Sequence, residues 1–334
     1  MANELVPVAQ SFSLPVAKVR PIFNLEEVQH RLAKLDEAGG QREHEALRST
    51  YQRMLERGPD RFQVKPSGVP DMSMLYNELP NFTDALDDIR RQVALSQDTS
   101  DGLEVTPMLL LGPAGIGKTR FARKIANLLG TGMNLIPMSS MTAGWLLSGS
   151  SSQWKGSKPG KVFQALVDGQ YANPVIVVDE VDKASANAQY DPLGALYGLL
   201  EHDSALDFTD EFAEVSIDAS QVVWVFTAND ERSIPGPIMN RLNVFEVEVP
   251  VDETARRVAL GLYQTIRAEH GWGERFAVEP EPNTLECLAK LVPREMRRAL
   301  MTGFGNARLD GRDTVKPCDL PTLSSRKKPI GFTQ

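Results

Sequence analysis

The sequence predicts an α/β fold: a parallel five-stranded sheet, followed by a small all-helical domain and preceded by a helical segment. Two observations support this prediction. Short apolar runs alternate with helical patterns in the middle of the chain, and from Val251 onward the pattern is purely helical. Strands that are apolar on both faces and separated by helices are typical of a parallel sheet covered on both sides. The apolar runs are 107–112, 134–140, 173–180, 221–229 and 243–249.

The composition excludes several classes of protein. Of the 334 residues, 42% are hydrophobic and 24% are charged, which excludes wholesale disorder and fibrous classes. The net charge of -8 provides no overall attraction for nucleic acid or an anionic membrane, although a local basic patch stays open. Cys287 and Cys318 show no spacing for zinc or a disulfide framework, which favours a reducing compartment, and we expect the cytoplasm. No apolar run approaches the roughly 20 residues that span a bilayer, so we expect no membrane partner.

The chain begins with two weakly patterned segments around a helical one. We expect a flexible arm over 1–20, a helical segment over 21–60 and a linker rich in Pro and Gly over 61–75. Asn24 and Glu27 resemble a capping box at the start of the helical segment. Two apolar stripes then predict a helical hairpin, which we interpret as a packing appendage, with a docking module as the alternative.

Two domains and a tail account for the remaining residues. The alternating pattern predicts an α/β domain over 76–250, and the helical pattern predicts a second domain over 251–311. Pro293 stands at a plausible first position of the last helix. Residues 312–334 are short and basic, and we expect a flexible tail.

A glycine-rich loop lies between the first apolar run and an amphipathic helix. Its glycines let backbone N–H groups surround phosphate oxygens at the helix N-terminus. Lys118 can reach the β- and γ-phosphates of a nucleotide, and the Thr119 hydroxyl can bind Mg²⁺. Because strand, loop and helix follow in the required order, we favour this interpretation over a chance turn. The residues are Gly112, Pro113, Ala114, Gly115, Ile116, Gly117, Lys118 and Thr119.

Polar residues end two further apolar runs. Asp179 and Glu180 follow the run that starts at Val175, at the carboxyl end of a strand, where ligands bind in open α/β sheets. Asp179 suits the Mg²⁺ shell, and Glu180 suits orienting and deprotonating an attacking water. Asn229 ends the next run, and its neutral amide can hold the water or the γ-phosphate. Such residues are otherwise common at loop starts, but the phosphate loop favours the functional interpretation.

Taken together, these motifs resemble the AAA+ ATPases, most closely the ATPase module of Lon protease. The resemblance covers about 79–307, and its most specific parts are 173–230 and 234–247. These contain Asp-Glu-x-Asp-Lys, an Asp-Pro-x-x-Ala-Leu helix, an acidic insert with Phe, Thr-Ala-Asn, and an Ile-Pro-x-Pro loop before Arg. The resemblance implies an AAA+ core with a helical lid, Mg²⁺-dependent hydrolysis of ATP and assembly of identical subunits into a ring, with a hexamer expected.

The same resemblance assigns roles to three residues. Asn229 becomes the sensor-1 residue, and Arg241 the arginine finger that a neighbouring subunit inserts at the γ-phosphate, with a surface ion pair as the alternative. Arg294 falls where sensor 2 of the lid contacts nucleotide, although Arg297 and Arg298 are close rivals.

Two segments resemble the loops of Lon that face the central pore. In 153–162, Trp154 would grip an unfolded polypeptide, with burial in a subunit interface as the alternative. Lys155 replaces the usual aliphatic residue, which leaves open a generic or a more acidic substrate. The acidic insert over 207–212 would be a second pore-facing loop or a solvated hairpin.

The C-terminal part of the chain departs from the Lon pattern. Lon continues into a Ser/Lys peptidase domain, for which the residues after about 311 leave no room, so we expect an ATPase that is not itself a peptidase and consider a separate peptidase or effector as a partner. The segment 329–332, Pro-Ile-Gly-Phe, resembles a docking motif of Clp-type unfoldases, and we favour a chance match.

The favoured function is an ATP-hydrolysing ring protein that threads or remodels a protein substrate. A nucleic-acid motor or loader is the first alternative; Lys155, Lys158 and Lys161 favour it and the acidic net charge opposes it. A nucleotide-gated scaffold is the second, and Glu180 and Asn229 oppose it.

Overall fold

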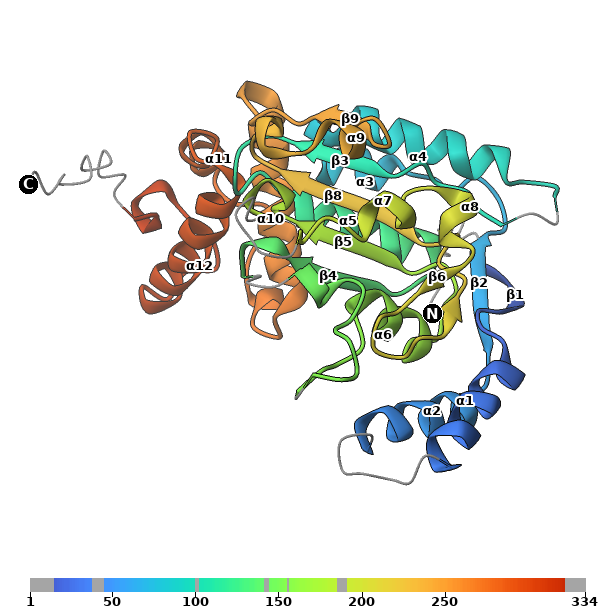
Figure 1. The fold of residues 1–334 in the computed structure, drawn as a ribbon. Coiled ribbons are helices and arrows are strands. Elements are labelled where there is room, and N and C mark those ends of the chain that lie inside the picture. The colour runs from blue at the N-terminus through green and yellow to red at the C-terminus, as the bar shows by residue number, and fades with distance from the viewer. Residues whose placement is uncertain are drawn as a thin grey trace, which may run out of the picture. The chain divides into compact units, whose positions relative to one another are not determined.

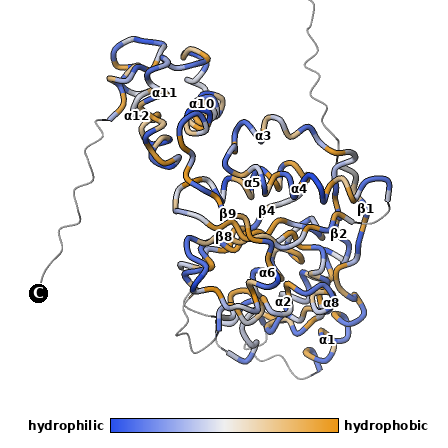
Figure 2. The backbone as a smooth tube through the Cα atoms, turned by 90° about the horizontal axis from the view of Figure 1, so that it is seen from above, coloured by the Kyte–Doolittle hydropathy of each residue, from blue (hydrophilic) through white to orange (hydrophobic). Residues whose placement is uncertain are grey.

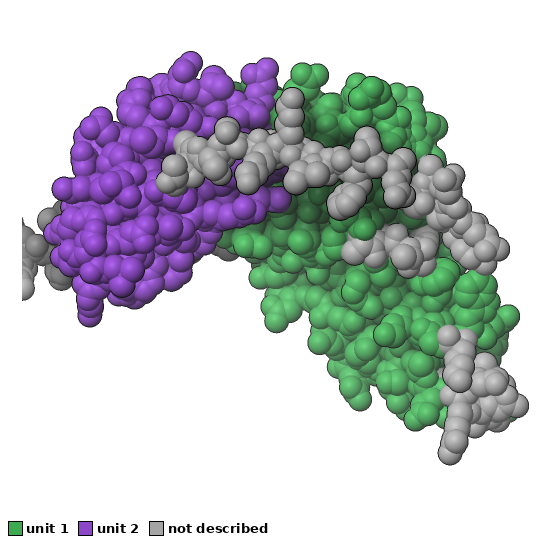
Figure 3. Space-filling view, turned by 90° about the vertical axis from the view of Figure 1, so that its left-hand side faces the viewer, with its two compact units in different colours: residues 1–72, 82–113, 118–247 green, residues 73–81, 114–117, 248–334 purple. Residues whose placement is uncertain are grey.

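The structure, a computed structural model, describes residues 15–37, 45–99, 102–140, 144–154, 156–184 and 191–321. Lys155 and the segment 329–332 lie outside the described residues. The chain divides into two compact units, shown in separate colours in Figure 3. The first comprises 1–72, 82–113 and 118–247, and the second comprises 73–81, 114–117 and 248–334.

A five-stranded parallel sheet forms the centre of the first unit (Figure 1). Its order is β4-β5-β8-β3-β9, and every neighbouring pair is parallel, which confirms the predicted fold class. Strands β5 and β8 are almost wholly buried because helices cover both faces. The strands are β3 (Met108–Leu111), β4 (Met133–Pro137), β5 (Val175–Asp179), β8 (Val223–Ala228) and β9 (Asn243–Glu246).

The register of the three central strands brings the predicted motifs together. Leu111 of β3 pairs with Ala228 of β8, and Val178 of β5 pairs with Phe226. The backbone N–H of Gly112 also donates to the Ala228 carbonyl oxygen at 3.1 Å. The phosphate loop, the acidic pair and the Asn at the end of β8 therefore share the carboxyl edge of one sheet.

Helices pack on both faces of this sheet. Figure 2 shows α4 and α5 on one face and α6 and α8 on the other. Phe82 and Phe121 stack on the α4/α5 side with ring centroids 5.1 Å apart. The helices of this part of the unit are α4 (Thr83–Leu95), α5 (Lys118–Leu129), α6 (Lys161–Val167), α7 (Leu196–Leu199), α8 (His202–Ala205) and α9 (Gly236–Met239).

The N-terminal segment differs from the expected arm and linker. Strands β1 (Pro15–Pro21) and β2 (Asp60–Pro66) pair as an antiparallel ribbon. The expectation of a flexible arm to residue 20 and a linker from residue 61 was therefore wrong at these positions. Pro66, one of the residues that suggested a linker, is the last residue of β2, where a missing N–H is tolerated.

In the sequence, the predicted helical hairpin comes between these two strands. It consists of α1 (Leu25–Glu37) and α2 (Glu45–Arg57). The Asn24 side chain caps α1 by accepting from the N–H of Glu26 at 2.9 Å. The Tyr51 hydroxyl of α2 donates to the Ala213 carbonyl oxygen at 2.9 Å. The hairpin therefore packs into the core of the first unit.

The second unit is helical, with α3 (Ser73–Glu78), α10 (Asp252–Glu269), α11 (Pro282–Leu288) and α12 (Pro293–Leu309). Tyr263 and Phe304 stack at its centre, with ring centroids 4.8 Å apart. No helix among the described residues is long and apolar enough to span a membrane.

The first residues of the expected tail belong to this helical core. Val315 is fully buried, and the Asp319 carboxylate accepts from the Arg312 guanidinium at 2.6 Å. The flexible-tail expectation was therefore wrong over 312–321, because Val315 packs against α12 and the Asn306 side chain of α12 donates to the Asp319 carbonyl oxygen at 2.8 Å.

Candidate active site

The phosphate loop folds as its glycines require. Gly115 and Gly117 have φ values of +84° and +112°, in the region that favours glycine. Ile116, between them, is buried, whereas Pro113 and Ala114 are exposed. The loop then leads directly into α5, whose first residue is Lys118.

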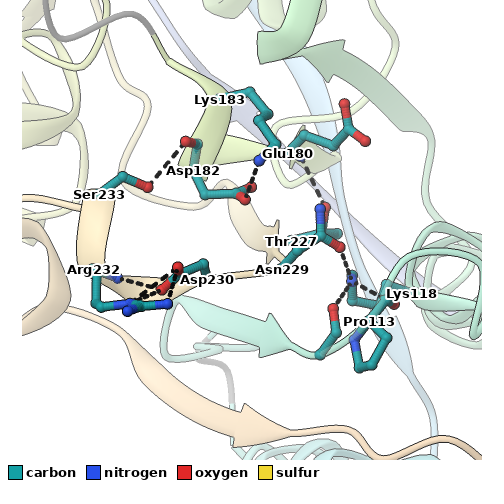
Figure 4. Close-up of polar contacts among 11 residues, drawn as sticks. Pro113, Lys118, Glu180, Asp182, Lys183, Thr227, Asn229, Asp230, Arg232 and Ser233 are labelled. Carbon is teal, nitrogen blue, oxygen red and sulfur yellow. Dashed lines mark hydrogen bonds and ion pairs between the residues drawn. The ribbon is translucent and has the colours of Figure 1, made fainter. Parts of the chain in front are cut away.

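Lys118 connects the loop to the end of β8. Its ammonium group donates to the carbonyl oxygens of Gly112 and Pro113, the latter at 3.0 Å, and to Oδ1 of Asn229 at 3.0 Å (Figure 4). The side chain is 8% exposed, so the charge is held in a largely desolvated place. A cation fixed beside a phosphate loop and a neutral amide suits a polyphosphate ligand.

Asp179 accepts hydrogen bonds from two hydroxyl groups. Thr119, on the first turn of α5, donates to its Oδ1 at 3.2 Å, and Thr227 of β8 donates to the same oxygen at 2.6 Å. Hydroxyl and carboxylate oxygens are ligands that Mg²⁺ prefers in proteins. Thr119 and Asp179 are thus placed as a potential pair of metal ligands.

Glu180 has a backbone conformation that few non-glycine residues adopt. Its φ is +56° and its N–H donates to Oγ1 of Thr227 at 2.9 Å. This residue precedes the short helix Val181–Lys183, and Figure 4 shows its carboxylate directed away from Thr227. Backbone strain of this kind persists only where surrounding contacts enforce it, and it is common at active sites.

Thr227 is the residue that sequence reasoning missed. It is 1% exposed and bonds both Asp179 and Glu180, so it joins the strand ends of β5 and β8. The signal was present, because Thr227 is the one hydroxyl side chain in the run Val-Trp-Val-Phe-Thr-Ala of β8. A buried hydroxyl needs a partner, and the neighbouring strand end supplies two.

Arg294 lies beside the phosphate loop within the second unit. Its backbone N–H donates to the Gly115 carbonyl oxygen at 3.1 Å, and a Cβ on Gly115 would lie 3.1 Å from the Arg294 Cβ. Its rival Arg297 instead pairs with Glu269 at 2.7 Å. Of these two arginines, Arg294 contacts the loop through its backbone.

Arg241 follows α9 and has partners within its own chain. Its Nε donates to Oε1 of Glu201 at 3.0 Å, its Nη2 contacts the same oxygen, and its Nη1 donates to the Pro237 carbonyl oxygen at 2.6 Å. The guanidinium is therefore fixed in one orientation, and its side chain is still 27% exposed.

Trp154 and the acidic insert lie on neighbouring loops of the first unit. Trp154 is 47% exposed, and its ring meets that of Trp145 edge to face, with centroids 5.8 Å apart. The insert forms a hairpin of β6 (Phe208–Thr209) and β7 (Ser216–Ile217).

Asp210, between these strands, is fully buried rather than solvated. Its carboxylate accepts from the N–H groups of Gly160, Phe212 and Ala213 at 2.8 to 3.0 Å. Burial raises the pKa of this carboxyl to about 6, although the three backbone hydrogen bonds lower it. The hairpin is thus bound to the loop that carries Trp154.

Comparison with known proteins matches the region that holds these contacts. Residues 108–252 match the family described as ATPase family associated with various cellular activities (AAA). Lon protease 2 of Hydrogenovibrio crunogenus is 34% identical over 183 residues, which cover 53% of this chain and 20% of that protein. Lon protease of Halothermothrix orenii is 31% identical over 240 residues, which cover 66% of this chain and 31% of that protein.

Solved structures share the fold at low sequence identity. A S. cerevisiae Hsp104:casein complex in an extended conformation aligns with a TM-score of 0.54 and 16% identity, over 71% of this chain and 47% of that chain. A RuvB mutant of Thermotoga maritima aligns with a TM-score of 0.50 and 13% identity, over 76% of this chain and 70% of that chain. The chain thus spans between a fifth and a third of the two curated relatives, 20% and 31% of their lengths. Residues 108–252 are therefore similar to the AAA ATPase family, and the chain is similar in sequence to part of the Lon proteases.

Proposed function

We propose that this protein hydrolyses ATP as a ring of identical subunits and uses the hydrolysis to thread or remodel a protein substrate. The observation that supports the ATPase most directly is the contact network at the carboxyl edge of the sheet. Lys118 is bonded to Asn229 there, and Thr227 joins Asp179 to Glu180. These residues provide the cation, the metal ligand and the base that phosphoryl transfer to water requires.

The phosphate loop and Lys118 would bind the triphosphate. The N–H groups of the loop and the N-terminus of α5 favour negative charge. Lys118 would exchange part of its present oxygen partners for phosphate oxygens without moving from its place between the loop and Asn229. Binding would thus replace protein contacts of the ammonium by stronger charged ones.

Thr119 and Asp179 would hold Mg²⁺. Mg²⁺ at such sites takes one or two protein ligands and completes its shell with phosphate oxygens and water, and it neutralises charge on the β- and γ-phosphates. A Mg²⁺ site of this kind therefore does not require a cluster of acidic protein ligands. The described residues contain no group of three or more His, Cys, Asp or Glu that could hold a metal by itself. Thr227 would keep the Asp179 carboxylate oriented.

Glu180 and Asn229 would act on the attacking water. The conformation of Glu180 is held by Thr227, and its carboxylate is free of that hydroxyl, since only the backbone N–H bonds it. The carboxylate can accept the proton of the water as the oxygen attacks phosphorus. The Asn229 amide can orient the same water or the γ-phosphate without adding charge.

Arg241 would complete the site of a neighbouring subunit. Its fixed, always charged guanidinium suits charge on the transferring phosphoryl group. This role requires a neighbouring subunit and therefore a ring. The ring that we propose is a hexamer.

Arg294 would contact the nucleotide from the helical lid of the same subunit. We propose the cytoplasm as the compartment of the protein.

A polypeptide is the substrate that we favour. The curated relatives are named as proteases, and the Hsp104 structure is titled as a complex with casein. Trp154 is exposed on a loop that adjoins the acidic hairpin, and an exposed aromatic ring can contact many side chains. We therefore propose that Trp154, with Lys155 next to it in sequence, meets the substrate.

Steady-state phosphate release by the full-length chain tests the proposal. Glu180→Gln should retain ATP binding and lose turnover, because the amide cannot take the proton of the water. Glu231→Gln, an exposed acidic residue on the helix Glu231–Ser233, is the matched control and should keep wild-type turnover. Unchanged turnover in Glu180→Gln would refute the mechanism.

The substrate part of the proposal needs a separate readout. Wild-type turnover should rise on addition of casein, an unfolded protein, and stay unchanged on addition of DNA. Stimulation by DNA alone would favour a nucleic-acid motor. Stoichiometric ATP binding with negligible turnover would favour a nucleotide-gated scaffold, and either result would overturn the favoured function.

A further inference from the structure

A groove of about 560 Å³ lies between the loop of Trp154 and the acidic hairpin, all within the first unit. Trp145, Trp154 and Phe208 form its aromatic walls, and Asp191 and Glu211 its acidic ones. We call it the acidic-aromatic groove. Its volume falls in the range of about 300 to 1,000 Å³ that is typical of ligand sites.

The aromatic walls present ring surface to solvent. Trp145 is 37% exposed and Trp154 47%, and their rings meet at 86°. The edge of one indole thus meets the face of the other, and both residues line the groove. Because the face of an indole is the negative part of its quadrupole, it attracts a cation.

The acidic walls are held in place by short contacts. The N–H of Glu211 donates to the Ser148 carbonyl oxygen at 2.7 Å, and the Ser148 hydroxyl donates to Oε1 of Glu211 at 2.9 Å. Oδ1 of Asp191 accepts from the N–H of Leu193 at 2.9 Å. A carboxylate has about four acceptor sites, so each side chain keeps the capacity to bind a cation.

The sequence on the side of the groove formed by Asp191 and the acidic hairpin is negative. Residues 184–231 include ten Asp and Glu residues and no Lys or Arg. On the loop side, Lys155 follows Trp154 in the sequence and lies outside the described residues. Lys158, on the loop, and Lys161, the first residue of α6, are not among the residues that line the groove, and the Lys161 ammonium donates to Gln164 on the same helix at 2.9 Å. Among the described residues that line the groove there is no lysine or arginine.

The Asp210 carboxylate links the two sides of the groove by hydrogen bonds. Its Oδ2 accepts from Gly160 on the loop side, while its Oδ1 accepts from Phe212 and Ala213 on the hairpin side. The walls are thus arranged before any ligand arrives, which lowers the entropy lost on binding.

We infer that the acidic-aromatic groove binds lysine and arginine side chains of an extended basic polypeptide. The cation would lie against the indole rings and pair with the carboxylates of Asp191 and Glu211, while its aliphatic stem packs on Phe208. This inference rests on the proposed function, because it narrows the protein substrate to basic segments. The negative charge of the hairpin disfavours nucleic acid at the same place.

Fluorescence anisotropy of labelled peptides, with the full-length chain and no nucleotide, tests this inference. One 20-residue peptide alternates Lys with Ser and Leu, and its partner carries Glu at every Lys position. The basic peptide should bind at least tenfold more tightly, and its affinity should fall as salt is raised. Equal affinities, or tighter binding of labelled single-stranded DNA, would overturn the inference.

Substitutions in the acidic-aromatic groove test whether the basic peptide binds there. Glu211→Gln combined with Asp191→Asn should weaken the basic peptide at least tenfold, and both amides preserve the acceptors used by Ser148 and Leu193. Trp154→Leu should weaken it as well, whereas Trp154→Phe should retain most of the affinity. Asp203→Asn, an exposed acidic residue outside the groove, is the control and should bind as the wild type does. Unchanged affinity in the double variant would overturn the inference.

ATP turnover separates this inference from the proposed function. Selective peptide binding without any turnover would refute the ATPase but leave the groove in place. Turnover that both peptides stimulate equally would refute the groove but leave the ATPase in place.

Discussion

The hydroxyl of Thr227 donates to Oδ1 of Asp179 at 2.6 Å and accepts the N–H of Glu180 at 2.9 Å. One buried side chain thus orients a metal ligand and holds the base in a left-handed backbone conformation. Neither function needs a charge, so Thr227 can fix both acidic residues without changing the charge of the site. Thr227 is therefore a positioning residue, and removal of its hydroxyl should affect catalysis more than the fold.

Thr227→Val should lower kcat for ATP by roughly 10- to 100-fold, the usual effect of removing a group that orients a metal ligand. The substitution keeps the side-chain volume but leaves the N–H of Glu180 without its acceptor. Thr227→Ser preserves the hydroxyl and is the control that should retain most of kcat. A Thr227→Val protein with wild-type kcat and KM would contradict the positioning role.

Lys118→Ala should weaken ATP binding by roughly 10- to 100-fold, since a hydrogen bond to a charged group contributes about 1.5 to 3 kcal/mol. The variant also leaves Oδ1 of Asn229 without the ammonium 3.0 Å away. Titration with a fluorescent ATP analogue measures the effect. Arg123→Ala, an exposed cation on the same helix, should bind as the wild type does, and equal losses in both variants would indicate a general charge effect instead.

Asp210→Asn should change how stability depends on pH. Burial raises the folded-state pKa of this carboxyl from its ordinary 3.8 to about 6, so the native state holds the proton more tightly than the unfolded chain. The ionised form therefore destabilises the fold above pH 6, and the penalty disappears as pH falls towards 4. Its full size is about 3 kcal/mol, from about 1.4 kcal/mol per pKa unit.

Melting temperatures of wild type and variant between pH 4.5 and 7.5 measure this linkage. Asparagine does not ionise, so the stability of the wild type relative to Asp210→Asn should decrease as pH rises to about 6 and then stay level. The amide leaves one of the three N–H donors poorly satisfied, which adds a constant offset. Asp207→Asn, an exposed residue of the same insert, is the control, and a difference that does not vary with pH would refute the assignment.

The parts of the fold that were predictable from sequence are those with local signals. The three central strands β3, β5 and β8 were predictable because buried parallel strands are continuous apolar runs. Lys118 and Asp179 were predictable because their motifs follow such runs directly. Pairing of β1 with β2 was not predictable, since the paired residues lie 51 positions apart at one end, Pro15 and Pro66, and 39 apart at the other, Pro21 and Asp60. The burial of Asp210 was missed for the same reason: its donor Gly160 is 50 residues away, and acidic composition alone suggests solvent.

Arg241→Ala should bind ATP normally and lose turnover, by roughly 1,000-fold if the residue acts as fingers do in related phosphoryl-transfer enzymes. Within its own chain the guanidinium is paired with Glu201 and with the Pro237 carbonyl oxygen, so the loss could also arise from local unfolding of α9. Arg256→Ala is the control. Arg256 also forms ion pairs with glutamates, Glu253 and Glu286, and its removal should leave turnover unchanged.

Mixing two inactive variants separates these explanations. In a ring that contains both variants, an Arg241→Ala subunit still has Glu180 and a Glu180→Gln subunit still has Arg241. Where the two are neighbours, one site can have the base of the first and the arginine finger of the second. Such sites are complete, so the mixture should regain a measurable part of wild-type turnover although neither variant has it alone. If Arg241 acts only through its ion pair with Glu201, no subunit of the mixture has both an intact base and an intact α9, and turnover stays absent at every mixing ratio. Phosphate release across a series of mixing ratios therefore decides whether Arg241 acts on the site of a neighbouring subunit.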